Sequence, residues 1–350
     1  DRNSAPTGAI RGMVNMLTAL ENEVPAQYRA VVFDASGDTF RNALYPEYKA
    51  HRNPMPDDLR AQIAPIHQVI ELLGWTVLVV PNVEADDVLG TLAVMGREQG
   101  LKTVISSGDK DLAQLVNDDV LLMDTMNGKR RDVAGVQAEF GVTPAQMLDF
   151  QTLMGDAIDN VPGVAKVGPK TAAKWLAEYG TLANIMANHD KIKGAVGENL
   201  RAALDWLPKG QELLKIKVDC ELDEHIPGLP QLNALSSREQ QTAALRDFYT
   251  QYGFKGLAAK LGGASQQPAG KAAGTKAPSS AGQTAAQATT TDMFAEPEAA
   301  SAAAGPTTYE TISTWAALDA WLAILKAASL TALDTETTSL NNMQAQIVGL

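Results

Sequence analysis

The sequence is poor in cysteine and in aromatic residues, and it has no long hydrophobic run. Its 350 residues include one cysteine, Cys220, which excludes disulfide frameworks and cysteine-based zinc sites. No apolar run approaches the roughly 18 residues of a membrane-spanning helix, and no signal peptide is recognisable. These absences favour a reduced, cytoplasmic setting without a membrane partner.

Positive charge is also in short supply. The chain has 29 Lys and Arg against 41 Asp and Glu, for a formal net charge of −12. This balance argues against a nucleic-acid binder that works through bulk positive charge, although a local basic surface is compatible with it. The chain begins at Asp1 rather than at Met and ends on an apolar run at Leu350. We therefore expect a fragment of a longer protein.

The composition changes at about Gly262. Residues 263–308 consist mainly of Ala, Gly, Ser, Thr, Gln and Pro, which predicts a disordered linker. Met293-Phe294 is a candidate docking motif for a partner protein, and the alternative is two stray apolar residues. Beyond the linker, a helical pattern at 315–327 and an apolar strand at 330–334 predict the beginning of a further domain over 309–350.

Before the linker, apolar strands alternate with helical patterns. Strands are expected at 30–34, 76–80, 102–106 and 120–123, and helices at 57–73, 84–99 and 110–116. This order is typical of an α/β fold with a mostly parallel sheet flanked by helices, here over residues 1–143. From residue 144 we expect strands to disappear and helices to dominate, so residues 144–262 form a helical subdomain.

Eight acidic residues fall in four groups where such a fold places active sites. They are Asp34; Glu84, Asp86 and Asp87; Asp109 and Asp111; and Asp156 and Asp159. Taken singly, each group has an alternative role in capping a helix. Together, acids beyond neighbouring parallel strands converge on one sheet edge and repel one another. Nothing nearby in the sequence supplies enough fixed cations, and all-oxygen ligands favour Mg²⁺ or Mn²⁺.

Two such ions about 4 Å apart are the usual arrangement for phosphodiester hydrolysis. The histidines offer no alternative ligand set, because His51, His67, His189 and His225 are scattered along the chain. We expect all four to be structural or exposed.

A glycine-bracketed turn follows the last acidic group. Gly163 and Gly168 flank it, and Pro169 suits the first position of a helix, so backbone N–H groups there can face a phosphate oxygen. Positive charge comes from three lysines at helical spacing: Lys166, Lys170 and Lys174. The segment resembles a helix-hairpin-helix element, which grips duplex backbone without reading sequence. The alternative is an ordinary glycine-rich turn with solvated lysines.

A second basic patch lies between Asp34 and the helix at 57–73. Lys49 and Arg52 are spaced i, i+3 and share a helix face if the segment is helical. They are candidates to hold a phosphate near the metals, with Tyr48 stacking on a base. The alternative is a solvated basic loop.

Six motifs then occur in an order typical of one family. They are Phe33-Asp-Ala35, Tyr48-Lys-Ala-His-Arg52, Glu84-Ala-Asp-Asp87, Gly108-Asp-Lys-Asp111, Gly155-Asp-Ala-Ile-Asp-Asn160 and the segment from Gly163 to Ala172. In this set the chain resembles the 5′-nuclease (flap endonuclease, PIN-like) domain of bacterial DNA polymerase I. The segment Leu333-Asp-Thr-Glu-Thr337 resembles the start of that family's ribonuclease-H-like 3′–5′ exonuclease domain.

The resemblance implies that all eight acids bind two divalent metals and hydrolyse DNA at a 5′ flap, a nick or a single-strand/duplex junction. It implies that Arg41, Lys49 and Arg52 contact the 5′ strand, that 163–171, including Thr171, binds the duplex, and that K⁺ can bind at this turn. Asp334 and Glu336 match the first metal-binding pair of the exonuclease domain. A monomer in the bacterial cytoplasm, associated with the nucleoid, is the expected setting.

The sequence departs from the family in two places. The family's first catalytic aspartate ends an opening strand that this sequence does not include, and Ala165-Lys166 stands where a Pro-Gly pair is common. Two other classes of function stay open at this point. One is a DNA-junction module that binds a flap without cutting it, and the other is a PIN-like ribonuclease.

Overall fold

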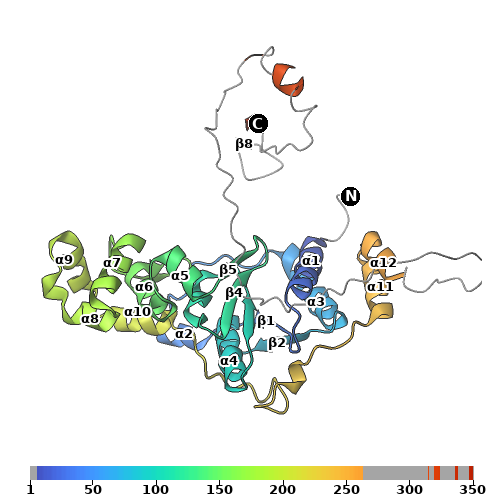
Figure 1. Cartoon of the computed structure of the whole chain (residues 1–350), viewed down its shortest axis with the longest axis horizontal. Helices are drawn as coiled ribbons and strands as arrows, with labels where there is room; N and C mark the ends of the chain where they lie inside the picture. The colour runs from blue at the N-terminus through green and yellow to red at the C-terminus, as the bar shows by residue number, and fades with distance from the viewer. Residues whose placement is uncertain (1–5, 263–313, 315–318, 324–335, 338–346, 350) are drawn as a thin grey trace, which may run out of the picture. The chain divides into compact units, whose positions relative to one another are not determined.

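The computed structural model describes residues 6–262, 314, 319–323, 336–337 and 347–349. Contacts divide the chain into two units, Asp1–Lys271 and Ala272–Leu350. The first unit begins with α1 (Gly8–Glu23), and its strands and helices alternate as far as Asp124. Figure 1 labels them by their order in the chain.

The other helices of the first unit are α2 (Phe40–Leu44), α3 (Asp57–Leu72), α4 (Ala85–Glu98), α5 (Val133–Phe140), α6 (Met147–Met154), α7 (Pro169–Tyr179), α8 (Leu182–Ala187), α9 (Gly194–Ala203), α10 (Leu207–Leu214), α11 (Thr242–Gln251) and α12 (Lys255–Gly262). Its strands are β1 (Ala30–Asp34), β2 (Thr76–Val80), β3 (Thr103–Ser106), β4 (Val120–Asp124), β5 (Lys129–Arg131), β6 (Gly155–Asp156) and β7 (Val161–Pro162). Short 3₁₀ helices span Lys110–Leu115, Pro144–Gln146, His189–Lys191 and Asn233–Leu235.

The strands form parallel pairs, as the alternation predicted, but the described strands do not join into one sheet. β1 pairs in parallel with β2, so that Ala30 lies opposite Thr76 and Asp34 opposite Val80. β3 pairs in parallel with β4, and β5 adds an antiparallel edge to β4. No ladder among the described residues joins these two sheets. They are held together by packing instead, because α4 contacts β1, β2 and β3.

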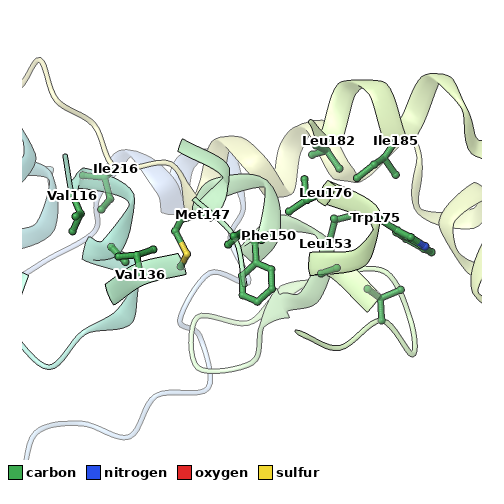
Figure 2. Packing of buried hydrophobic residues seen from close by; sticks show 14 of the residues in the cluster. Val116, Val136, Met147, Phe150, Leu153, Trp175, Leu176, Leu182, Ile185 and Ile216 are labelled. Atoms are coloured by element: carbon green, nitrogen blue, oxygen red, sulfur yellow. The ribbon is translucent and has the colours of Figure 1, made fainter. Parts of the chain in front are cut away.

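The helical subdomain has its own core. Phe150 and Leu153 from α6 pack with Leu176 from α7 and with Leu182 and Ile185 from α8, and Figure 2 shows these side chains converging. Leu153 and Ile185 are fully buried, and each such side chain contributes about 1.5–3 kcal/mol through the hydrophobic effect. This core positions the turn between α6 and α7.

The expectation that strands disappear after residue 144 is wrong for one short ladder. β6 and β7 pair antiparallel, with Gly155 opposite Pro162 and Asp156 opposite Val161. Gly155 has φ +75°, and a Cβ atom there would lie 2.3 Å from the backbone nitrogen of Gly163. Only glycine permits this crossing of two backbones. A two-residue pairing leaves no periodic pattern in the sequence, which is why it was missed.

A second core joins helices that are distant in sequence. Ile10 and Val14 of α1 pack with Val69 and Ile70 of α3 and with Phe248 of α11. The helices α1, α3, α11 and α12 lie together on one side of the strands, and α6 to α10 lie on the other (Figure 1). The strand ends that carry the acids therefore lie between two separately packed groups of helices.

In the second unit, a helical turn occupies 319–323, and β8 (Glu336–Thr337) pairs antiparallel with β9 (Ile347–Gly349). Glu336 thus lies on a strand. The predicted linker, Met293-Phe294, the strand at 330–334 and Asp334 lie outside the described residues. Within the described part of the chain, no helix has the length and apolar character needed to span a membrane.

Candidate active site

The acids at the carboxyl ends of the strands lie close enough to influence one another. Asp34 ends β1, and its Oδ1 accepts a hydrogen bond of 2.8 Å from the N–H of Ala85 at the start of α4. Burial raises the pKa of Asp86 to about 7, and the negative charges of Asp109, Glu84 and Asp34 add to the increase. The parallel strands thus bring three of the predicted acidic groups together.

Asp111 has the same electrostatic character. Burial raises the pKa of its carboxyl to about 7, and repulsion by Asp109 adds to the effect. Its Oδ1 accepts a hydrogen bond of 2.5 Å from Nε2 of Gln151 on α6, while its own N–H donates to Oδ1 of Asp109 at 2.9 Å. A carboxyl group that resists ionisation in this way is a site where a cation is favoured.

Glu84 and Asp159 are held together by the basic loop after α2. The hydroxyl of Tyr48 lies 3.0 Å from Oε2 of Glu84 and 2.9 Å from Oδ2 of Asp159. Lys49 pairs with Glu84 and lies 3.6 Å from Asp159, and Arg52 pairs with Asp159 at 2.7 Å. This loop therefore joins α4 to the helical subdomain through ionic contacts.

The burial of Tyr48 corrects one prediction. Its side chain is 2% exposed and packs with Val161, Leu213 and Leu214, so it has no free face on which a base could stack. Lys49 and Arg52 are more open, with side chains 23% and 47% exposed. They stay candidates for a phosphate contact.

Asp156 is neutralised from both sides. Its Oδ1 accepts the N–H groups of Ile158 and Asp159, and its Oδ2 lies 3.2 Å from Nζ of Lys110. Burial alone would raise the pKa of Asp156, but these hydrogen bonds and the lysine outweigh it, so that the pKa lies below its ordinary value. Lys110 sits between Asp109 and Asp111 in the sequence, and its pairing with Asp156 was not predicted.

Arg41 and Asp87 form a buried ion pair, and both lie away from the positions expected of them. Arg41 is 2% exposed and Asp87 is fully buried. Nη1 and Nη2 of Arg41 donate to the two carboxylate oxygens of Asp87 at 2.6 and 2.7 Å. In this arrangement Arg41 cannot reach a DNA strand and Asp87 cannot reach a metal ion. The DNA contact of Arg41 and the metal contact of Asp87 stay predictions, which this pairing does not favour.

The supply of fixed cations was underestimated from the sequence. Four of the eight acids have a Lys or Arg partner within 4.0 Å: Glu84, Asp87, Asp156 and Asp159. As they stand, no three acidic, histidine or cysteine side chains in the described ranges converge closely enough to hold a metal ion.

The acids without such a partner are the ones that fit a metal. Asp34, Asp86, Asp109 and Asp111 form no ion pair with any described residue, and two of them have pKa values raised to about 7. Their donor atoms are all hard carboxylate oxygens, which suit Mg²⁺ or Mn²⁺. The local charge therefore fits a divalent cation at these four acids, and the metal contacts of the other four acids stay predictions.

A polar pocket of about 400 Å³ lies beside the ion pair of Glu84 and Lys49. It is lined by Asp34 and Glu84 on the acidic side and by Lys49 and Arg52 on the basic side. A group entering this pocket meets carboxylates and cations at once. A phosphate with a bound metal ion has the charge distribution that such a pocket suits.

The turn between α6 and α7 presents lysines to solvent. Gly168 is the N-cap of α7, Pro169 takes its first position, and Lys166, with φ +63°, lies on the turn itself. Lys170 and Lys174 are exposed, and the three lysines form no ion pair with described residues. Thr171 is half-buried beside them, and Gly163 is needed for the close approach of the backbone to Gly155. This turn is free to contact an anionic partner.

Gln151 contacts the acidic site, which the sequence did not predict. It is 3% exposed, and it accepts a hydrogen bond of 2.7 Å from Gln114 while donating to Asp111. Nothing in the sequence marks it, because α6 also carries the polar residues Asp149 and Thr152. His51 is exposed, and His67 packs against Phe33 at a ring-centroid distance of 4.4 Å. Nδ1 of His189 lies 3.2 Å from Asp190, which is not one of the eight acids.

Two family models match the chain. One is described as the 5′-3′ exonuclease N-terminal resolvase-like domain and matches residues 1–141. The other is described as the 5′-3′ exonuclease C-terminal SAM fold and matches residues 142–235. Together they cover the α/β core and most of the helical subdomain.

The curated relatives agree with these matches. DNA polymerase I of Pseudomonas aeruginosa is 41% identical over 353 residues, which cover 99% of this chain and 35% of that protein. The 5′-3′ exonuclease of Aquifex aeolicus is 39% identical over 240 residues, covering 67% of this chain and 82% of that protein. The chain thus spans about a third of the Pseudomonas polymerase and matches most of the shorter exonuclease.

Solved structures share the fold. The 5′-exonuclease of bacteriophage T5 with bound zinc has a TM-score of 0.54 and 20% identity, covering 71% of this chain and 90% of that one. A complex of the T5 D15 flap endonuclease with DNA and metal ions has a TM-score of 0.53 and 19% identity, covering 74% and 94%. The predicted α/β fold with a helical subdomain is confirmed by this likeness, whereas the ribonuclease-H-like start stays a prediction.

Proposed function

The chain belongs to the 5′-3′ exonuclease family, and from that premise we propose that its first unit is a metal-dependent flap endonuclease that hydrolyses DNA phosphodiester bonds at a 5′ flap or nick. The observation that carries the proposal is the pocket in which Asp34 and Glu84 face Lys49 and Arg52. Such a pocket supplies both the acids that hold cations and the cations that hold a phosphate.

We propose that Asp34, Asp86, Asp109 and Asp111 hold two divalent ions, Mg²⁺ or Mn²⁺. When bound, these ions activate a water molecule and stabilise the leaving oxygen. The raised pKa values of Asp86 and Asp111 support this assignment, because a bound cation relieves the repulsion that keeps these carboxyls protonated. Glu84, Asp156 and Asp159 would join the metals only if they exchange their lysine and arginine partners.

The chain's own groups then orient the DNA. Lys49 and Arg52, on the basic side of the pocket, contact the phosphate next to the cleaved bond. Tyr48 fixes the distance between Glu84 and Asp159 through its hydroxyl rather than by stacking on a base. The turn from Gly163 to Thr171 binds the duplex backbone through its lysines and N–H groups, and a K⁺ ion at this turn belongs to the same proposal.

We also propose which longer protein this chain comes from. The match to 35% of a DNA polymerase I supports an origin in the N-terminal part of such a polymerase, with replication and repair of DNA as its role. On this reading, 263–308 links the nuclease to a 3′–5′ exonuclease-like domain that begins near 309, where Asp334 and Glu336 would bind a metal. A monomer associated with the bacterial nucleoid completes the proposal.

A cleavage assay on a 5′-flap DNA with Mg²⁺ tests the function. Asp109→Ala is expected to lower kcat by at least about 100-fold, because one carboxylate of the metal site is lost. The matched control is Asp119→Ala, which removes an acid paired with Lys102 at the opposite end of the β3–β4 ladder. If the chain in Mg²⁺ cuts nothing, or if Asp109→Ala cuts as fast as the control, the proposal is wrong.

The same assay separates the two alternative functions. A junction module would bind the flap as tightly as a nuclease does, but it would leave the flap intact. A PIN-like ribonuclease would cut an RNA flap of the same sequence faster than the DNA. The exposed lysines of the turn after Gly163 favour binding to duplex DNA, but they do not distinguish binding from cutting.

A further inference from the structure

We propose that Arg41 and Asp87 are a positioning pair, which holds the acids of α4 and the basic loop in their working arrangement without touching DNA or metal. The proposal rests on the nuclease function proposed above and assigns these two residues a role in it. The evidence is the hydrogen bonding of both side chains and the three chain segments that they join.

All the lone pairs of Asp87 are in use. Oδ1 accepts from Nη2 of Arg41 at 2.7 Å and from the N–H of Lys217 at 2.8 Å. Oδ2 accepts from Nη1 of Arg41 at 2.6 Å and from the N–H of Glu84 at 3.0 Å. A carboxylate offers about four such positions. Since all four are filled by donors inside the protein, none is left for a metal ion.

The donors of Arg41 are equally committed. Besides Asp87, Nε donates to the carbonyl of Leu213 at 2.8 Å and Nη2 to the carbonyl of Lys215 at 2.8 Å. Nη1 also lies 3.3 Å from Oε2 of Glu84. Four of the five N–H groups of the guanidinium thus donate hydrogen bonds to oxygen atoms of the protein. The remaining N–H group belongs to Nη1, whose nearest other acid is Glu84, and the whole side chain is buried away from solvent.

The pair connects segments that are far apart in sequence. Arg41 lies on α2, directly before the loop that carries Lys49 and Arg52, and Asp87 lies in the first turn of α4. The carbonyl groups that Arg41 binds belong to the end of α10 and the residue after it, about 170 positions along the chain. One guanidinium therefore sets the position of the basic loop, the acidic helix and the helical subdomain relative to one another.

This geometry separates the adjacent residues of the Glu84–Asp87 motif by function. Asp87 points into the protein and caps the first turn of α4 by accepting the N–H of Glu84. Glu84 and Asp86 are half-buried, next to Asp34 and Lys49. Loss of Asp87 would leave the buried Arg41 with Glu84 as its nearest acid, which would draw Glu84 away from the pocket. Loss of Arg41 would leave Asp87 as a buried carboxylate without a counter-charge, next to Glu84.

Two single variants and their combination test the pair in the full 350-residue chain. Arg41→Gln and Asp87→Asn are each expected to weaken Mn²⁺ binding, measured by calorimetry without DNA, and to lower kcat on flap DNA, both by about 10- to 100-fold. The double variant is expected to be no worse than either single one, because the two side chains act as a unit. The salt dependence of binding to flap DNA without divalent metal should be unchanged, because neither residue contacts a phosphate.

The salt dependence separates this proposal from a DNA contact. If Arg41→Gln lowers the slope of log K against log salt by about one, Arg41 contacts a phosphate and the proposal is overturned. Wild-type Mn²⁺ affinity and kcat in both single variants would overturn it as well. A wild-type chain that neither binds Mn²⁺ nor cuts the flap overturns the nuclease function itself, together with this inference.

The control is the other ion pair with a buried arginine, between Arg131 on β5 and Glu139 on α5. Nε of Arg131 lies 2.7 Å from Oε2 of Glu139, and Arg131 is 7% exposed. Arg131→Gln should lower the thermal midpoint and leave Mn²⁺ affinity unchanged; an equal loss of Mn²⁺ affinity there would show that any weakening of the core has this effect and would refute the proposal. If Arg41→Gln does not fold, Arg41→Lys, which keeps the charge but not the paired contacts, replaces it and carries the same expectations.

Discussion

The raised pKa of a single residue, Asp111, indicates that this site favours a cation. It is half-buried on a 3₁₀ helix, with one carboxylate oxygen held by Gln151 and with Asp109 two residues away. Burial and the neighbouring charge raise its pKa to about 7 from an ordinary 3.8. Without metal, the folded chain therefore retains at this position a proton that the unfolded chain releases in weak acid.

The sign of the resulting pH dependence follows from linkage. Between pH 4 and 7 the folded state binds more protons at Asp111 than the unfolded state does, so the free energy of unfolding falls as pH rises. We predict that Asp111→Asn, in EDTA, equals the wild type near pH 4 and is more stable by roughly 1–3 kcal/mol at pH 8. Urea unfolding across this range measures it. Curves that stay parallel from pH 4 to 8 would rule out the raised pKa.

At the scale of elements, α7 and the turn before it combine a rigid backbone with free charge. Pro169 and Gly168 define the start of the helix, and Trp175 and Leu176 anchor it in the subdomain core. On the opposite face, Lys170 and Lys174 are exposed. The element therefore holds its lysines in a fixed geometry, as a backbone-binding element requires.

We predict that Lys170→Ala weakens binding to duplex DNA and lowers the salt slope by about one, equally for any DNA sequence. Fluorescence titrations from 50 to 300 mM KCl would measure both quantities. Lys102→Ala is the matched control, because Lys102 is an exposed lysine that pairs with Asp119 at the far end of β3. An unchanged slope for Lys170→Ala, or the same change in the control, would count against a phosphate contact.

Elements with a strong periodic pattern were predicted to within about two residues. The strand Thr76–Val80 matches its predicted bounds, and the helix Asp57–Leu72 ends one residue before its predicted end, because apolar residues at regular spacing leave clear local signals. The ladder of β6 and β7 was missed, and the division of the strands into two sheets was not foreseen. Pairing between strands depends on partners distant in sequence, which a local pattern does not contain.

At the scale of the whole molecule, the site lies where the α/β core and the helical subdomain meet. Asp34, Asp86 and Asp109 come from the α/β core, while Gln151, Asp156 and Asp159 come from the helical subdomain. Lys110 and Asp156 link the two, as do Lys49 and Asp159. Ions that bind at this junction stabilise only the folded chain, since the unfolded chain does not assemble the acids.

Metal should therefore raise the stability of the whole first unit. We predict that Mg²⁺ at 100 times its dissociation constant increases the free energy of unfolding by about 2.7 kcal/mol relative to EDTA. Differential scanning calorimetry at pH 7.5 measures it as a higher thermal midpoint. Asp86→Asn should remove most of this increase and Asp119→Asn should retain it. A thermal midpoint that does not respond to Mg²⁺ would contradict the assigned site.

The sequence by itself determined the α/β order of elements, the family and the residues that carry charge, because these depend on local pattern and on motif spacing. Only the tertiary structure decided which charges are available. It paired Arg41 with Asp87, buried Tyr48, and gave Glu84, Asp156 and Asp159 cationic partners. The reason is physical: the ionisation and availability of a carboxylate depend on burial and on charges within a few ångströms, and most of those neighbours are distant in sequence.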